Sequence, residues 1–151
     1  MRLVAWSENL TAERAAEFGA QPVTKDELLR ISDVVTIHLV LSDRTRGLIG
    51  ARELGLMKPT AYLVNTSRGP IVDEAALVAA LESGTIAGAG LDVYDREPLP
   101  DYHALRSAPR TVQTPHLGYV TEENYRTMYG QTVEAVEAFL AGQPLRVLVA
   151  G

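Results

Sequence analysis

Short apolar runs of strand length alternate with helix-like segments along most of this 151-residue chain. Such alternation is typical of a parallel sheet whose strands are connected by helices. The sequence therefore predicts an α/β fold of the doubly wound, Rossmann-like type, with helices on both faces of the sheet. The predicted strands are residues 3–6, 22–23, 34–41, 61–65, 86–93 and 111–113. Because the run at 34–41 is almost continuously apolar, we expect a central strand that is buried on both faces.

Capping residues mark the ends of the predicted helices. Thr11 precedes one helix, and Thr24 with Glu27 has the spacing of a capping box at the start of another. Asp73 begins the clearest helix, which Gly84 ends. The predicted helical segments are residues 12–18, 25–32, 53–57, 74–83 and 121–140.

Composition excludes several classes of protein. With 46% hydrophobic and 22% charged residues, the chain suits a soluble globular domain. A net charge of -5 leaves no basic surface for nucleic acid. No apolar run approaches the roughly 18 residues of a membrane helix, and no signal peptide is visible, so we predict a cytoplasmic protein with no membrane partner. There is no cysteine and no helical pair of metal-ligand type, so we predict no metal.

Four polar residues follow predicted strands, at the edge where ligands gather in open α/β sheets. They are Arg68, Asp92, Glu97 and His116. An arginine can hold a carboxylate in a bidentate fork and polarise the neighbouring carbonyl. A histidine can donate a proton to the carbonyl oxygen during reduction, and an adjacent glutamate favours the protonated ring.

Each candidate also has a simpler interpretation. Arg68 would suit a solvated turn, Glu97 a loop charge, and His116 a cap for the helix after Thr121. Asp92 would then be an ordinary turn acceptor. Two further histidines are not assigned to the site: we expect His38 to be a core residue within its strand and His103 to be solvated.

Four segments of the chain resemble the D-isomer-specific 2-hydroxyacid dehydrogenases. The segments are residues 38–50 (HLVLSDRTRGLIG), 63–74 (LVNTSRGPIVDE), 90–98 (GLDVYDREP) and 114–118 (TPHLG). The resemblance extends from residue 1 to about residue 141. Val40 differs from it, since many relatives have proline there.

The resemblance implies an NAD- or NADP-dependent oxidoreductase acting on a small 2-keto or 2-hydroxy acid, and a homodimer. It places the catalytic set on Arg68, Glu97 and His116, and the contact with the nicotinamide carboxamide on Asp92. It also implies cofactor contacts by Asn65 and Thr66. After the first strand, Glu8 would serve the adenosine ribose of NAD, whereas Ser7 at the aligned position leaves NADP open.

The chain departs from the family pattern because it contains no G-x-G-x-x-G turn for the pyrophosphate. We expect residues 1–141 to be a partial dinucleotide-binding domain and residues 142–151 a tail that returns to a substrate domain. In the doubly wound order, the strand before such a turn separates strands 3–6 and 34–41. These two strands could pair directly, or a second chain could insert between them, but we expect them to remain apart as part of a longer protein. The alternative function is a catalytically inactive remnant or an assembly module.

Overall fold

The computed structural model describes residues 1–148. The chain forms two compact units, Met1–His116 and Leu117–Gly151. The predicted boundary between residues 141 and 142 falls within the second unit, and residues 149–151 of the predicted tail lie outside the described residues.

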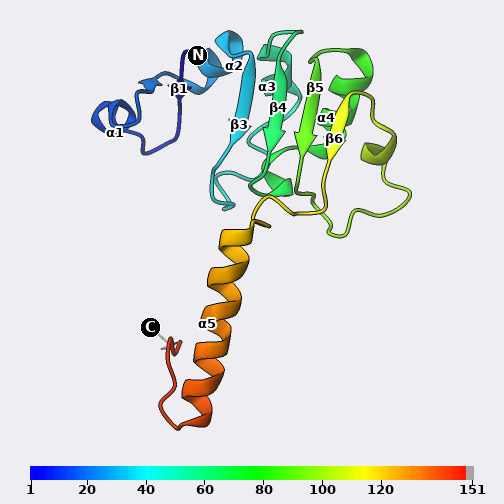
Figure 1. The fold of residues 1–151 in the computed structure, drawn as a ribbon. Coiled ribbons are helices and arrows are strands. Elements are labelled where there is room, and N and C mark those ends of the chain that lie inside the picture. The colour runs from blue at the N-terminus through cyan, green and yellow to red at the C-terminus, as the bar shows by residue number, and fades with distance from the viewer. Residues whose placement is uncertain (149–151) are drawn as a thin grey trace. The chain divides into compact units, whose positions relative to one another are not determined.

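The first unit contains a four-stranded parallel sheet, which confirms the predicted α/β class (Figure 1). Its strands lie in the order β3 (Val34–Ile37), β4 (Tyr62–Asn65), β5 (Gly88–Leu91) and β6 (Thr111–Gln113). Because the strands are parallel and follow one another in sequence, all four carboxyl ends lie at the same edge. This edge carries the candidate site.

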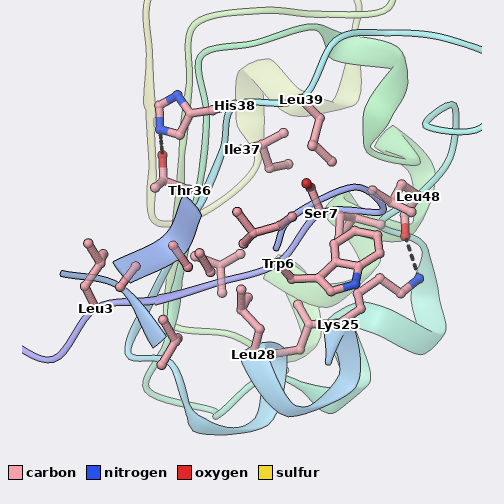
Figure 2. Close-up of a pocket in the computed structure, with 18 of the residues that line it drawn as sticks. Leu3, Trp6, Ser7, Lys25, Leu28, Thr36, Ile37, His38, Leu39 and Leu48 are labelled. Carbon is pink, nitrogen blue, oxygen red and sulfur yellow. Dashed lines mark hydrogen bonds between the residues drawn. The ribbon is translucent and has the colours of Figure 1, made fainter. Parts of the chain in front are cut away.

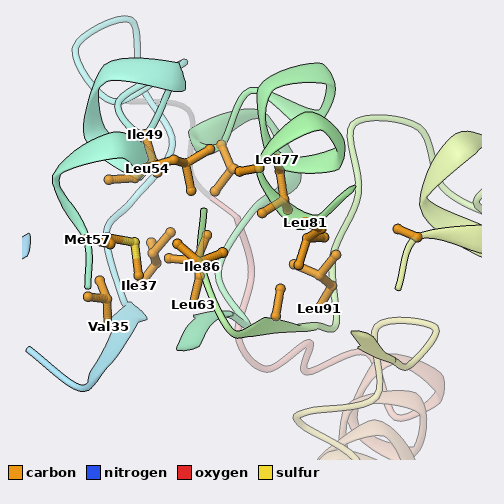
Figure 3. Close-up of a cluster of buried hydrophobic side chains, with 14 of the residues drawn as sticks. Val35, Ile37, Ile49, Leu54, Met57, Leu63, Leu77, Leu81, Ile86 and Leu91 are labelled. Atoms are coloured by element: carbon orange, nitrogen blue, oxygen red, sulfur yellow. The ribbon is translucent and has the colours of Figure 1, made fainter. Parts of the chain in front are cut away.

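One face of this sheet forms the hydrophobic core (Figure 3). Val35 pairs in register with Leu63, which pairs with Ala89, so these buried side chains share a face. Helices α2 (Lys25–Ile31), α3 (Ala51–Leu56) and α4 (Glu74–Ser83) supply the other side of the core. Their fully buried members include Leu29, Leu54, Leu77 and Leu81.

The opposite face of the sheet does not match the prediction that helices cover both faces. In the described part of the first unit, this face exposes Val34, Tyr62 and Val112. Strand β3 is also an edge strand with alternating exposed and buried residues, so the prediction of a central strand buried on both faces was wrong. The apolar run at 34–41 contains a strand that packs on one face only. The outer edge of this strand pairs with no described strand.

A second, two-stranded parallel sheet lies apart from the first. It joins β1 (Val4–Ala5) to β2 (Gln21–Pro22), with α1 (Ala12–Ala16) between them in the chain. Strand β1 forms no ladder with β3 in the described residues, so these segments do not pair directly, as predicted. A cavity of about 500 Å³ is lined by residues of both strands, among them Ala5 and Ile37 (Figure 2).

The predicted N-caps of three helices and the predicted end of α4 are confirmed, whereas α1, α2 and α3 differ from their predicted bounds by one or two residues. The hydroxyls of Thr11 and Thr24 accept from backbone amides in the first turns of α1 and α2. Asp73 caps α4 in the same way, and Gly84 ends that helix in the left-handed conformation with φ 72°. The two short 3-10 helices, η1 (Gly69–Ile71) and η2 (Ala104–Ser107), were not predicted.

The second unit is dominated by α5 (Glu122–Leu140). The Thr121 hydroxyl accepts from the Asn124 amide, so this threonine caps the helix as predicted. After the helix, the chain returns far enough for Arg146 to pair with Glu134 at 2.7 Å. Among the helices of residues 1–148, none combines the length and apolarity needed to cross a membrane.

Candidate active site

Three sequence-predicted residues lie just beyond the carboxyl ends of neighbouring strands. Arg68 follows β4, Glu97 follows β5, and His116 follows β6. Because these strands are adjacent and parallel, the segments that carry the three residues leave the sheet at one edge. The sheet order therefore gathers residues that are up to 48 positions apart in the chain (116 − 68).

Glu97 and His116 form a direct pair. The Glu97 Oε2 atom lies 2.7 Å from His116 Nδ1, and the Tyr94 backbone amide donates to Oε1 at 3.0 Å. Both side chains are little more than one-third exposed, so the pair is accessible from solvent without being fully hydrated. This contact fixes the ring orientation, as a carboxylate does for many functional histidines.

The environment of Glu97 favours its ionised form. Burial raises the pKa of its carboxyl, but hydrogen bonds from His116 and the Tyr94 amide, with the charges of His116 and Arg68, outweigh burial. The net effect places the pKa below its ordinary value. Glu97 is therefore a carboxylate at neutral pH, and the contribution of Arg68 indicates that its positive charge acts on the pair.

His116 has a backbone conformation that few non-glycine residues adopt. Its φ of 59° lies in the left-handed region, which costs about 1–2 kcal/mol for a residue with a β-carbon. The cap of α5 is the Thr121 hydroxyl, so the simpler interpretation of His116 as that cap was wrong. Strain of this kind is frequent at functional sites.

The turn that presents Arg68 is held by a buried asparagine. Asn65 is 1% exposed, its Oδ1 accepts from the Ser67 amide at 3.0 Å, and its Nδ2 donates to the Arg68 carbonyl at 3.0 Å. The Ser67 hydroxyl donates to the carbonyl of Leu39, two residues beyond the end of β3. The Arg68 side chain itself is exposed. Asn65 thus positions Arg68, a role that the sequence did not reveal.

Gly69 brings this turn against the segment that leads to Glu97. A β-carbon added to Gly69 would lie 2.0 Å from the Tyr94 carbonyl carbon and 2.4 Å from the Asp95 nitrogen. Both of those atoms are backbone, which cannot move aside as a flexible side chain can. Only glycine allows this approach, and it is what brings the Arg68 turn next to the Glu97 segment.

We expect Gly69→Ala to destabilise the chain by at least about 2 kcal/mol, because the added methyl must displace backbone. Gly55→Ala is the matched control, since a β-carbon there meets nothing within 4 Å. That control should leave stability unchanged or raise it by up to about 1 kcal/mol. Urea unfolding of the two variants measures both effects, and equal stabilities would show that the close approach does not constrain the chain.

Asp92 and Thr114 connect the ends of the two strands nearest the Glu97–His116 pair. Asp92 is 5% exposed, and its Oδ1 accepts from the Thr114 hydroxyl at 2.5 Å. Its backbone amide donates to the Asn65 carbonyl at 3.0 Å. A cavity of about 520 Å³ adjoins this region. Its lining residues include Tyr94, Glu97, Leu99, Arg106, Thr114 and His116.

The residues predicted to bind the adenosine side lie elsewhere. Ser7 lines the cavity between β1 and β3, where Figure 2 places it near Leu39. Glu8, the other residue predicted for the adenosine side, is exposed and is not among the residues lining that cavity. Thr66, predicted only as a cofactor contact, is exposed on the turn before Arg68. The structure thus separates Ser7 from the site at Arg68, Glu97 and His116.

The two other histidines differ from their predicted roles. His38 is exposed, contacts the Thr36 hydroxyl at 3.0 Å and lines the β1–β3 cavity, because β3 ends before it. His103 is not simply solvated, since its Nε2 lies 3.2 Å from Glu74 Oε2. The other oxygen of that carboxylate accepts from the Asp95 amide at 2.8 Å. Glu74 therefore ties His103 to the segment that carries Glu97.

Comparison with known proteins identifies relatives over nearly the whole chain. The family described as "D-isomer specific 2-hydroxyacid dehydrogenase, NAD binding domain" matches residues 1–118. The glyoxylate reductase of Aeropyrum pernix is 46% identical over 143 residues, which is 95% of this chain and 43% of that protein. The glyoxylate/hydroxypyruvate reductase B of Enterobacter agglomerans is also 46% identical, over 85% of this chain and 39% of its own length.

Solved structures agree with the sequence matches. A putative D-3-phosphoglycerate dehydrogenase from Ralstonia solanacearum superposes with a TM-score of 0.88 at 37% identity, over 97% of this chain and 43% of that one. The NAD-complexed D-isomer specific 2-hydroxyacid dehydrogenase from Lactobacillus delbrueckii ssp. bulgaricus gives 0.78 at 32% identity, over 98% and 48%. The chain thus spans less than half the length of these relatives.

Proposed function

The chain belongs to the D-isomer specific 2-hydroxyacid dehydrogenase family, and on that basis we propose that it carries the catalytic residues of an oxidoreductase. The reaction would transfer a hydride between NAD(P)H and a small 2-keto acid, or run in the reverse direction. The observation that supports this most is the Glu97–His116 pair, together with the close approach of the Arg68 turn to the segment that carries Glu97.

Arg68 would bind the substrate carboxylate. A guanidinium can donate two parallel hydrogen bonds to a carboxylate, and it is more weakly hydrated than an ammonium. Its exposed position on a turn held by Asn65 suits a group that must meet an anion from solvent. From there its charge would also polarise the carbonyl next to the carboxylate.

His116 would supply the proton to the carbonyl oxygen. When the ring is protonated, Nδ1 donates to Glu97 and Nε2 carries the proton that we assign to the substrate. The Glu97 carboxylate stabilises the charged ring and holds its plane. In the reverse direction, the neutral ring would take the proton from the hydroxyl of a 2-hydroxy acid.

The residues fit the nicotinamide end of a dinucleotide better than its centre. Asp92 places a buried carboxylate just after β5, where it would contact the carboxamide, and its backbone amide donates to the Asn65 carbonyl. We propose that Asn65 and Thr66 also contact the cofactor. Ser7 and Glu8 would serve the adenosine side, for NAD or NADP. In residues 1–148, no glycine-rich turn opens a helix to cradle the pyrophosphate. When bound, NAD(P)H supplies the hydride.

Within the whole protein, residues 1–141 would act as the cofactor-binding part and residues 142–151 as a return to a substrate domain. We also propose a homodimer. The rival proposal, an inactive assembly module, would keep the fold without turnover.

We expect the 151-residue chain by itself to bind NAD(H) and NADP(H) only weakly. Pyrophosphate binding depends on helix N-terminal amides and a close glycine turn, and this sequence contains no such turn. Calorimetric titration with each cofactor measures the affinity, and ADP-ribose serves as a control for the part of the ligand without nicotinamide. Micromolar affinity for either cofactor would contradict the expectation.

A chimera tests the proposed function directly. In it, this chain replaces the matching 143-residue segment of the Aeropyrum pernix glyoxylate reductase, so that the rest of a known enzyme surrounds it. We expect oxidation of NADH or NADPH that depends on added glyoxylate or hydroxypyruvate. A chimera that folds and binds cofactor but shows no keto-acid-dependent turnover would favour the inactive module.

A further inference from the structure

Tyr94 contacts both sides of the Glu97–His116 pair. Its backbone amide donates to Glu97 Oε1 at 3.0 Å. Its hydroxyl lies 3.1 Å from the Thr114 carbonyl oxygen and 3.2 Å from that of Leu91. The residue is 6% exposed, and its hydroxyl contact with Leu91 is buried, whereas its contacts with Glu97 and Thr114 are partly buried.

The Tyr94 hydroxyl acts where the chain leaves β6 for His116. The Thr114 amide donates to the Leu91 carbonyl at 2.9 Å, and the Thr114 hydroxyl donates to Asp92. The carbonyl of Thr114 is the third polar group of that residue, and it faces Tyr94. Each polar group of Thr114 is therefore held by a different partner.

Holding that carbonyl restricts the following residues. The carbonyl direction sets the plane of the Thr114–Pro115 peptide, and the proline ring fixes the next φ. His116 comes immediately afterwards, in the left-handed region with φ 59°. With so few rotatable bonds between them, a turn of the Thr114 carbonyl would move the imidazole away from Glu97.

We propose that Tyr94 is the positioning residue of the Glu97–His116 pair: its amide holds the carboxylate, and its hydroxyl holds the segment that carries the imidazole. This inference rests on the proposed function for its catalytic meaning, but the geometry it concerns can be measured without turnover. A hydroxyl that only filled space in the core would affect stability and leave the pair unchanged.

Tyr94→Phe separates the two contacts, because it keeps the ring and the amide and removes only the hydroxyl. The probe is the imidazole ¹⁵N spectrum of the full 151-residue chain, which contains three histidines. In the unaltered chain, Nδ1 of neutral His116 should be the protonated nitrogen, because it donates to the Glu97 carboxylate. In the variant, we expect the His116 signals to move towards the mixture of tautomers found in free histidine.

The Glu97 carboxyl gives a second signal. The hydrogen bond from His116 helps to hold its pKa below the ordinary value, so ¹³C titration of the variant should show that pKa rising. The control is Tyr102→Phe, since Tyr102 is 84% exposed, and it should change neither signal. His38 and His103 report whether the variant keeps its fold.

The inference is overturned if Tyr94→Phe leaves the His116 tautomer and the Glu97 titration unchanged. Should the variant fail to fold, the unaltered chain still provides a test. Its Tyr94 hydroxyl proton is expected to exchange slowly with water, and fast exchange would contradict the hydrogen bond to the Thr114 carbonyl. In the chimera, the same substitution should lower kcat/KM on the order of tenfold, with cofactor affinity retained. If Tyr94→Phe changes the His116 spectrum but the activity of the chimera does not depend on His116, the proposed function is refuted. The positioning role of Tyr94 then stands.

Discussion

Arg68→Ala in the chimera is expected to lower kcat/KM for a 2-keto acid by at least about a hundredfold, or roughly 3 kcal/mol of transition-state binding. In the proposed function, the substitution removes the carboxylate anchor and the group that polarises the carbonyl at the same time. Steady-state rates at saturating cofactor measure the loss. Because the Arg68 side chain is exposed, the variant should retain the stability of the parent.

Two further variants separate charge from geometry. Arg68→Lys keeps the positive charge without the planar fork, and it should recover only part of the loss. Arg96→Ala removes an exposed arginine next to Glu97 and should change the rate little. Near-normal kcat/KM in Arg68→Ala, or a similar loss in Arg96→Ala, would show that Arg68 is not the carboxylate anchor.

His116→Asn is expected to reduce keto-acid reduction by about 10²–10⁴-fold while cofactor affinity changes little. The asparagine side chain can still form a hydrogen bond with Glu97, but it cannot carry the proton that the carbonyl oxygen needs. Turnover and cofactor binding are measured separately, by absorbance and by calorimetry. His38→Asn is the matched control, since His38 is an exposed histidine in the same unit and lines a different cavity from His116. Equal losses of binding and turnover would indicate that His116 has a structural role.

The sequence predicted the elements that local chemistry determines. Strand β6 has the predicted bounds, and the caps at Thr11, Thr24 and Asp73 are present, because capping depends on residues three positions apart. The catalytic candidates were found because strand ends gather polar residues and because the motifs resemble a known family. Both signals can be read from the sequence alone.

The errors concern contacts that are set by the sheet as a whole. The apolar run at 34–41 has the composition of a central strand, yet β3 is an edge strand of the described sheet. Whether a strand is central or at the edge of a sheet depends on its pairing partners and not on its composition. The sequence around His103 does not indicate that Glu74 is its partner. Only folding brings the two residues together.

The positioning residues were missed for a similar reason. Gly69 is an unremarkable glycine in the sequence, and its importance comes from the Tyr94 backbone that lies against it. Tyr94 itself was part of a recognised motif, but the Thr114 carbonyl that it binds lies 20 residues later. Sequence alone thus indicated the residues that would react and not the contacts that hold them.

The most direct test of the account is a single-turnover measurement of hydride transfer in the cofactor-saturated chimera. The rate of NAD(P)H oxidation is recorded after mixing with keto acid, for the parent, Arg68→Ala and His116→Asn, with cofactor occupancy measured in each. The proposed function predicts equal occupancy and a hydride-transfer rate that falls by at least about a hundredfold in both variants. Full occupancy with an unchanged rate in either variant would contradict it.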